Sequence, residues 1–266
     1  TGYSVSSAGD VDGDGKDDLI FGAPKSDEGG TTYLVTAADL AAADLADGAD
    51  GVIALGSIAP QTTSYQFIAT EQRDSAGFSV SSAGDVDGNG KDDLLIGAFN
   101  AHGGTAFAKG EVYLVAASDL AAADAVDGVV DGKIDLDSVK AQGSSYQFIG
   151  TESRDNAGTS VSSAGDVDGD GKDDLIIGAW AADGGGTTSG EAYLVTAVDL
   201  AAADAVDGVD GLIDLDSIKA QSTSYQFIGA QANSQAGFSV ASAGDVDGDG
   251  KDDLIIGYES REFTSS

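Results

Sequence analysis

Residues 83–94 read Ala-Gly-Asp-Val-Asp-Gly-Asn-Gly-Lys-Asp-Asp-Leu, and this pattern occurs four times in the chain with Asp or Asn at its seventh position. The first aspartates of the four copies are Asp10, Asp85, Asp166 and Asp245. They lie about 80 residues apart, a spacing typical of proteins built from repeated supersecondary units. Most of the variation in repeat length falls in a single connection, as expected for a surface loop on a fixed scaffold. The chain is therefore a tandem repeat.

Each repeat contains four segments that predict β-strands. In the second repeat they are Phe78–Ala83, Asp93–Ala98, Glu111–Val115 and Tyr146–Ile149. The first alternates large and small residues, and the second is apolar on both faces, which indicates a strand buried on both sides. Val, Ile, Tyr and Phe enrichment supports all four strands.

An alanine-rich insertion separates the third and fourth segments. In the second repeat it covers residues 118–128, with Asp119 near its start and Gly128 at its end. Alanine and leucine favour helix, an early aspartate suits the helix dipole, and glycine suits a left-handed cap. We expect a short helix on the rim of each repeat. The following residues 127–135 hint at a second cation site, but a helix end running into a short extended segment explains them better.

Tandem four-stranded units predict an all-β fold, a β-propeller of four-stranded antiparallel blades with short helical insertions between strands three and four. A parallel β-helix is the alternative, although its repeats are usually far shorter. The strand pattern gives three complete blades and half of a fourth in one chain. The expected repeats are 1–75, 76–156, 157–235 and a half-blade at 236–258, followed by a tail at 259–266.

Composition limits the function classes. The chain has 46 Asp and Glu against 12 Lys and Arg, a formal net charge of −34. Such a surface repels phosphate backbones and anionic lipids, so nucleic acid is not an expected partner. We expect no membrane insertion, because no apolar run approaches the ~18 residues of a spanning helix. The chain has no cysteine, which rules out disulfides and thiolate metal sites.

The repeated loop has the chemistry of a calcium site. Aspartates at positions one, three, five and nine can converge on one centre, the glycine at six permits the turn, and position seven can offer its carbonyl. Ca²⁺ prefers six to eight oxygen ligands, whereas Mg²⁺ demands a stricter octahedron and is the second choice. We expect about four Ca²⁺ per chain. The predicted ligands are Asp10, Asp12, Asp14, the Lys16 carbonyl and Asp18; Asp85, Asp87, Asn89, the Lys91 carbonyl and Asp93; Asp166, Asp168, Asp170, the Lys172 carbonyl and Asp174; and Asp245, Asp247, Asp249, the Lys251 carbonyl and Asp253.

A solvated acidic turn is the alternative for any one loop, since Asp-Gly is common in hairpins. Four copies with intact spacing favour metal, because unpaired carboxylates this close together would repel one another strongly. The site containing Asn89 should bind more weakly, since an amide replaces a carboxylate there. The neighbouring aspartates, one per loop, are expected to point outward; they are Asp17, Asp92, Asp173 and Asp252.

These repeats resemble the FG-GAP repeats of the integrin α-subunit propeller and of bacterial secreted proteins. The resemblance covers essentially the whole chain, and it rests on the Asp-x-Asp-x-Asp-Gly-x-x-Asp loops and on Phe21-Gly-Ala-Pro24. It implies that each loop joins strands one and two of a blade. The chain departs from the family pattern in the order Gly77-Phe78 and in Thr159, which replaces the aromatic residue.

The resemblance also implies a function. It points to a calcium-stabilised extracellular binding or adhesion module, non-catalytic, secreted and bacterial. Relatives bind ligands on the face opposite the calcium loops, which makes candidates of five residues there: Phe99, His102, Arg73, Arg154 and Trp180. Loop aromatics can equally fill the gap between blades, and we favour that interpretation for them.

Three other functions stay open: a sugar-binding lectin, an accessory domain of a secreted polysaccharide-degrading enzyme, and a purely architectural array, natural or engineered. We expect no enzyme activity from this chain, because no Ser, Cys or Glu near its single histidine, His102, recurs in the other repeats. The half-blade predicts self-association into a dimer that closes a ring, or continuation into a longer repeat array. The protein or glycan ligand is unknown.

Overall fold

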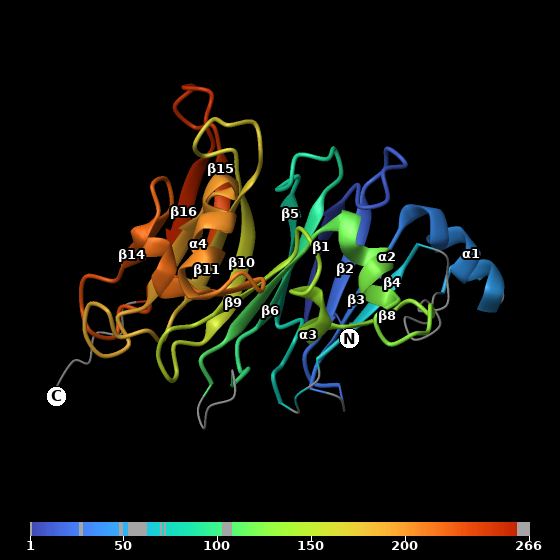
Figure 1. Ribbon diagram of the computed structural model, residues 1–266, viewed down its shortest axis with the longest axis horizontal. Coiled ribbons are helices and arrows are strands. Elements are labelled where there is room, and N and C mark those ends of the chain that lie inside the picture. Colours follow the sequence, from blue (N-terminus) through green and yellow to red (C-terminus); the bar gives the residue numbers. More distant parts are fainter. Residues whose placement is uncertain are drawn as a thin grey trace.

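The structure is a computed structural model, and it describes residues 2–26, 29–47, 50–52, 63–69, 71, 73–102 and 108–259. Its β-sheets stand side by side like the leaves of a fan, in chain order (Figure 1). The aspartate loops lie along one edge of this fan. No helix in the described ranges is long and apolar enough to cross a membrane.

Three sheets each contain four antiparallel strands in the order of the chain, as the repeats predict. The first has β1 (Ser4–Gly9), β2 (Asp18–Ala23), β3 (Thr31–Val35) and β4 (Tyr65–Ile68); the second has β5 (Ser79–Gly84), β6 (Asp93–Ala98), β7 (Glu111–Val115) and β9 (Tyr146–Ile149); and the third has β10 (Ala157–Gly165), β11 (Asp174–Ala179), β12 (Glu191–Val195) and β14 (Tyr225–Ile228). A fourth sheet has only β15 (Ser239–Gly244) and β16 (Asp253–Gly257).

The second and third strands are the most buried part of the second and third sheets. All six residues of β6 and of β11 are buried, as their continuous apolar sequence predicts. Glycines at the strand ends permit unusually close packing between sheets: a Cβ on Gly22 would lie 1.8 Å from the Gly77 carbonyl oxygen. Neighbouring sheets therefore approach each other backbone to backbone at these points.

The sheets are not purely antiparallel, and here the prediction of four-stranded antiparallel blades is incomplete. A short strand from the insertion of one repeat adds, in parallel, to the outer strand of the preceding sheet. Strand β8 (Lys133–Asp135) pairs with β4, and β13 (Leu212–Asp214) pairs with β9. The segment after Asp127 is thus extended, and its role is to join one blade to the one before it.

Helical segments occupy the insertions, as predicted. They are α1 (Ala37–Asp47), η2 (Ala117–Asp119), α2 (Leu120–Asp124), α3 (Leu136–Val139), η3 (Ala197–Asp199), α4 (Leu200–Asp207) and η4 (Leu215–Ala220). Three aspartates at equivalent positions, Asp39, Asp119 and Asp199, join the helical insertion to the segment before the fourth strand. Asp199 accepts hydrogen bonds from the backbone and side chains of Thr223 and Ser224, which lower its pKa to about 2 although partial burial opposes this.

The hydrophobic core is divided into layers between adjacent sheets. The layer between the first two sheets includes Phe67, Tyr113 and Ile134, and the next layer includes Phe148, Tyr193 and Ile213. The third layer is much smaller, with five buried residues around Ile176 and Val240. In the other two layers, residues of the third strand, the helix and the added strand of the following repeat complete the core. Among the described residues the fourth sheet has no such segments, which explains the smaller layer.

Candidate metal centres

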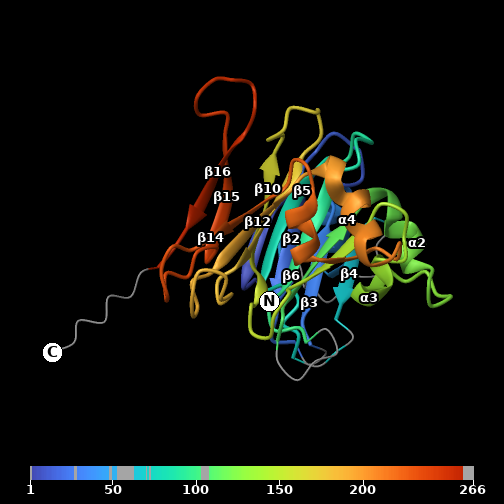
Figure 2. The ribbon, with the colours of Figure 1, turned by 60° about the vertical axis from the view of Figure 1, so that its left-hand side comes forward.

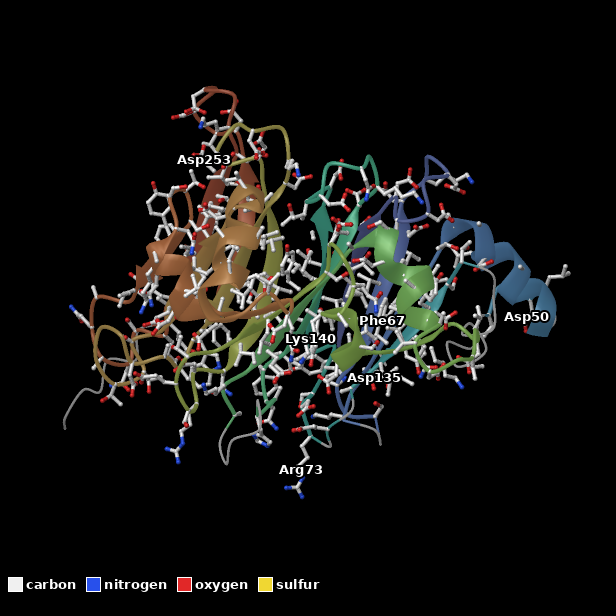
Figure 3. All side chains as sticks on the ribbon, viewed as in Figure 1. Asp50, Phe67, Arg73, Asp135, Lys140 and Asp253 are labelled. Carbon is white, nitrogen blue, oxygen red and sulfur yellow. The ribbon has the colours of Figure 1, made fainter. Side chains whose placement is uncertain are left out.

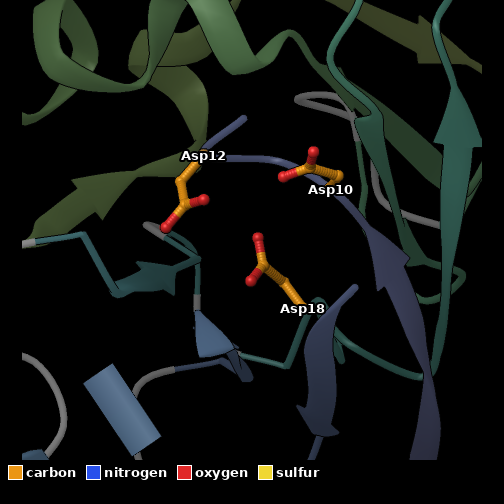
Figure 4. Close-up of side chains that lie close together, drawn as sticks. All are labelled: Asp10, Asp12 and Asp18. Atoms are coloured by element: carbon orange, nitrogen blue, oxygen red, sulfur yellow. The ribbon is translucent and has the colours of Figure 1, made fainter. Parts of the chain in front are cut away.

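The four aspartate loops each connect the first two strands of a sheet. In the first loop, ligand atoms of Asp10, Asp12 and Asp18 all lie within 4.8 Å of one another (Figure 4). The same three positions, one, three and nine, converge in the other loops; these groups are Asp85, Asp87 and Asp93; Asp166, Asp168 and Asp174; and Asp245, Asp247 and Asp253. Sequence spacing alone thus identified all four clusters.

Position five of the loop has a different set of contacts. The Asp14 carboxylate accepts the Lys16 amide and pairs with the Lys16 ammonium at 2.9 Å, and this pair lowers the pKa of Asp14. Asp170 and Asp249 likewise accept the amides of Lys172 and Lys251. None of these position-five aspartates belongs to the described three-carboxylate groups. Their coordination, and that of the lysine carbonyls, stays a prediction.

Backbone amides fix the carboxylate at position one. The two Asp10 oxygens accept hydrogen bonds from the amides of Gly13, at 2.8 Å, and Gly15, at 2.9 Å. Both glycines have positive φ, 81° and 84°, a conformation that costs glycine little. The loop therefore bends around its own first aspartate and needs glycine at these two places.

The aspartate at position nine is the buried anchor of each loop in the three complete blades. Asp174 is fully buried, and its two oxygens accept the Val167 amide at 3.0 Å and the Ala197 amide at 2.9 Å. Asp18 and Asp93 make the equivalent pairs of bonds. Each carboxylate therefore joins the loop to the start of the helical insertion.

Burial also makes this anchor electrostatically costly. Loss of water raises the pKa of Asp174 to about 6 and of Asp93 to about 7, although the backbone amides oppose the shift. A divalent cation at the centre of the three carboxylates would neutralise this charge. The donor set is entirely oxygen, which suits Ca²⁺ better than the nitrogen- and sulfur-preferring metals. The residues fit the predicted ion.

One expectation about these loops is wrong. Three of the four neighbouring aspartates do not point outward. Asp92 reaches back to the preceding blade, where its carboxylate accepts the Asp10 amide at 2.7 Å, and its own amide donates to the Asp10 carbonyl at 3.2 Å. The same reciprocal pairs link Asp173 to Asp85 and Asp252 to Asp166. Asp17 alone is exposed, because no described blade precedes it.

The lysines of the second, third and fourth loops strengthen this link. The Lys91 ammonium donates to the Asp12 carbonyl at 2.8 Å, and Lys172 donates to the Asp87 carbonyl at 3.0 Å. Lys251 makes the same contact with Asp168. Successive aspartate loops are therefore joined directly to one another. Sequence reasoning missed this link, because a run of two aspartates does not show which one faces the neighbour.

The link can be tested with a matched pair of substitutions. Asp92→Asn should lower the free energy of unfolding by about 1–2 kcal/mol, since it weakens a charge-assisted bond to a backbone amide between blades. Asp17→Asn, at the equivalent exposed position, should change stability by less than about 0.5 kcal/mol. Urea unfolding at saturating calcium measures both. Equal effects of the two substitutions would contradict the role of Asp92.

The five candidate ligand residues lie away from the loops. Arg73 projects from the edge of the molecule opposite Asp253 (Figure 3). Arg73 and Arg154 both have positive φ, 82° and 81°, which is uncommon for a bulky side chain. Phe99 contacts Phe78 with ring centroids 4.3 Å apart. The two arginines thus share one strained backbone conformation at the same point of successive repeats.

The remaining two candidates are Trp180 and His102. Trp180 meets Phe238 of the next sheet edge-on at 6.4 Å, and His102 is partly buried. Trp180 thus contacts the following repeat, whereas Phe99 contacts a residue of its own repeat. The contacts described above do not group the five candidates into one site, and their role in binding stays a prediction.

A buried carboxylate on this same side predicts a pH effect. Asp74 is 5% exposed, and among the residues that the structure describes one of its oxygens has no hydrogen-bond partner. Burial, followed by the charges of Glu111, Glu71 and Asp137, raises its pKa to about 7. Because the folded pKa exceeds the unfolded value of 3.8, the protein loses stability as the pH rises from 3.8 toward about 7.

Asp74→Asn should therefore stabilise the calcium-loaded protein by about 1 kcal/mol at about pH 8, where the aspartate is charged. Near pH 5 the benefit should largely disappear, because the aspartate is then mostly protonated. Thermal melts over this range measure the effect. Asp155→Asn is the control, since both Thr151 and Glu152 donate hydrogen bonds to the Asp155 carboxylate. A pH-independent benefit of Asp74→Asn would contradict the assignment.

Comparison with known proteins agrees with the repeat pattern. The FG-GAP repeat family matches residues 1–35, 76–115, 157–195 and 236–261, more than half of the chain. Among curated proteins, integrin alpha-5 of Xenopus laevis is 27% identical over 261 residues. The match covers 96% of this chain and 19% of the integrin, so the chain spans about a fifth of that relative's length.

Proposed function

Because the chain belongs to the FG-GAP repeat family, we propose that it is a calcium-stabilised, extracellular binding or adhesion module that performs no catalysis. The observation that carries this proposal is the set of four equivalent aspartate clusters, each built into the first hairpin of a blade and linked to the next. Calcium in these positions stabilises the scaffold and leaves the opposite edge for a ligand. The likeness to an integrin α subunit supports an adhesive role outside the cell.

The metal part of the proposal has a direct test. Titration of the calcium-free chain with Ca²⁺, followed by calorimetry, should reach about four ions per chain, with Mg²⁺ binding more weakly. The Asn89 loop should be the weakest of the three loops in complete blades. Asn89→Asp should strengthen that site, while Asp17→Asn should leave the stoichiometry unchanged.

The binding part needs an array of extracellular-matrix proteins and glycans, probed with the labelled chain. Binding should require calcium and should be lost in Arg73→Ala or Arg154→Ala at unchanged melting temperature. Cleavage of a polysaccharide by the chain would overturn the non-catalytic assignment. Glycan binding that Trp180→Ala abolishes would favour the lectin function.

For assembly we propose that the open side of the molecule is met by further polypeptide, from a second copy in a ring-closing dimer or from further repeats. Mass determination in solution distinguishes the two. A monodisperse monomer at high concentration would exclude the dimer.

A further inference from the structure

The first two complete sheets each receive a strand on their outer edge. Strand β8 lies along β4 and β13 lies along β9, both in parallel and with the same three-residue register. The backbone amide of Gln66 donates to the Gly132 carbonyl at 2.7 Å, and the backbone amide of Gln147 donates to the Gly211 carbonyl at 2.8 Å. The outer strands of the first two blades are therefore both acceptors for an added strand.

The third blade has the same acceptor strand without an added strand. Strand β14 has the same sequence, Tyr-Gln-Phe-Ile, as β4 and β9, and it pairs with β12 in the register of the earlier sheets. Within the described residues no strand lies on its outer edge. Phe227 is 37% exposed, whereas its equivalents Phe67 and Phe148 are fully buried. In Figure 2, β14, β15 and β16 form one border of the molecule.

The apolar face beside β14 is also open. A groove of about 570 Å³ runs between β14 and β16, and its walls include Phe227, Ile228, Ile256 and Tyr258. One blade earlier, Tyr193 and Val195 of β12, Leu200 of α4 and Ile213 of β13 belong to the buried cluster that contains Phe148. These residues come from the third strand and the insertion of a repeat. The groove thus occupies the position that such residues fill between the second and third blades.

We propose that the β14 edge and this groove form a docking surface for the second half of one further repeat of this type, comprising its third strand, insertion and fourth strand. The inserted strand adds in parallel to β14, and its central isoleucine covers Phe227. The third strand fills the groove and pairs with the free edge of β16. The occupant is defined by the pattern of residues 190–229, whose equivalents serve this purpose twice within the chain.

The occupant must carry a glycine before its inserted strand. Gly211 has φ 76°, and a Cβ there would lie 2.1 Å from the Lys140 carbonyl oxygen. Lys219 of η4 follows β13 as Lys140 follows β8, so it lies at the corresponding point of the third blade. A docked strand that copies β13 therefore tolerates glycine and no larger residue at this position.

The test uses the full calcium-loaded chain and a synthetic peptide with the sequence of Val209–Gln221. The peptide should bind saturably and slow hydrogen exchange of the Gln226 backbone amide about tenfold or more. This backbone amide corresponds to those of Gln66 and Gln147, which donate to the added strands. Gly211→Ala and Ile213→Asp in the peptide should each weaken binding at least about tenfold. These variants leave the folded chain unchanged, so a folding defect cannot mimic the result.

Substitution in the chain gives the complementary evidence. Phe227→Asp should abolish peptide binding, while Val130→Asp, which replaces an exposed valine of another repeat, should not. The proposal is overturned if no saturable binding occurs, or if the Gly211→Ala peptide binds as tightly as the parent. It is also overturned if the chain alone dimerises and protects the Gln226 amide without peptide, because the occupant is then a second copy.

Discussion

Removal of calcium with EDTA should abolish cooperative unfolding of this chain, or lower its melting temperature by tens of degrees. At a free calcium concentration about 100 times Kd, each site contributes about 2.7 kcal/mol. Four sites together contribute about 10 kcal/mol, which is comparable to the whole stability of an ordinary domain, about 5–15 kcal/mol. Without the ions, three carboxylates remain close together in each loop and repel one another.

Thermal melts by circular dichroism, with and without chelator, measure this effect. Restoring calcium should restore the original curve, and an equal charge concentration of sodium chloride should not. The sodium control is needed because general screening also relieves repulsion in a chain of net charge −34. An unchanged melting curve in EDTA would refute a structural role for the metal.

The largest effect of a single substitution is expected at Asp174. Asp174→Asn should destabilise the calcium-loaded protein by about 3–5 kcal/mol, the usual range for breaking a buried charged network. An asparagine offers only one acceptor oxygen, so its amino group would face the amide of either Val167 or Ala197. The ion would lose an anionic ligand as well. Chemical unfolding with calcium present measures the loss.

Two comparisons isolate the cause. As the free calcium concentration is lowered, the penalty of Asp174→Asn should shrink, because the substitution then removes an uncompensated buried charge. Asp253→Asn is the matched control, since Asp253 is only partly buried and its described backbone contact is with the Val246 amide. It should cost less than half as much as Asp174→Asn. Equal costs at the two positions would mean that burial is not the source of the effect.

Local sequence was enough to predict the blades and their loops. Strands β6, β7 and β9 have the predicted bounds, because apolar runs between glycine-rich turns leave little freedom. The loop aspartates at positions one, three and nine converge as predicted because glycines and backbone amides determine the turn. Both results depend on residues close together in sequence.

What sequence reasoning missed depends on contacts between repeats. Strand β8 has only three residues, two of them exposed, and its partner β4 precedes it by more than sixty residues. Nothing in its own composition marks it as a strand. Asp92 and Asp93 are chemically identical neighbours, and only the position of the preceding blade decides that one faces Asp10 and the other faces its own loop.

The pairing of each loop with the next has a mechanical consequence. Asp92, Asp173 and Asp252 connect nearest neighbours only, in a single line along one edge of the fan. A force that separates the two ends of this line loads the links in series, and the weakest one yields first. Rupture of one link leaves the hairpins on either side intact, and separation of the first three blades also requires loss of the pairing of β8 or β13. Extension should therefore proceed in discrete steps of one blade.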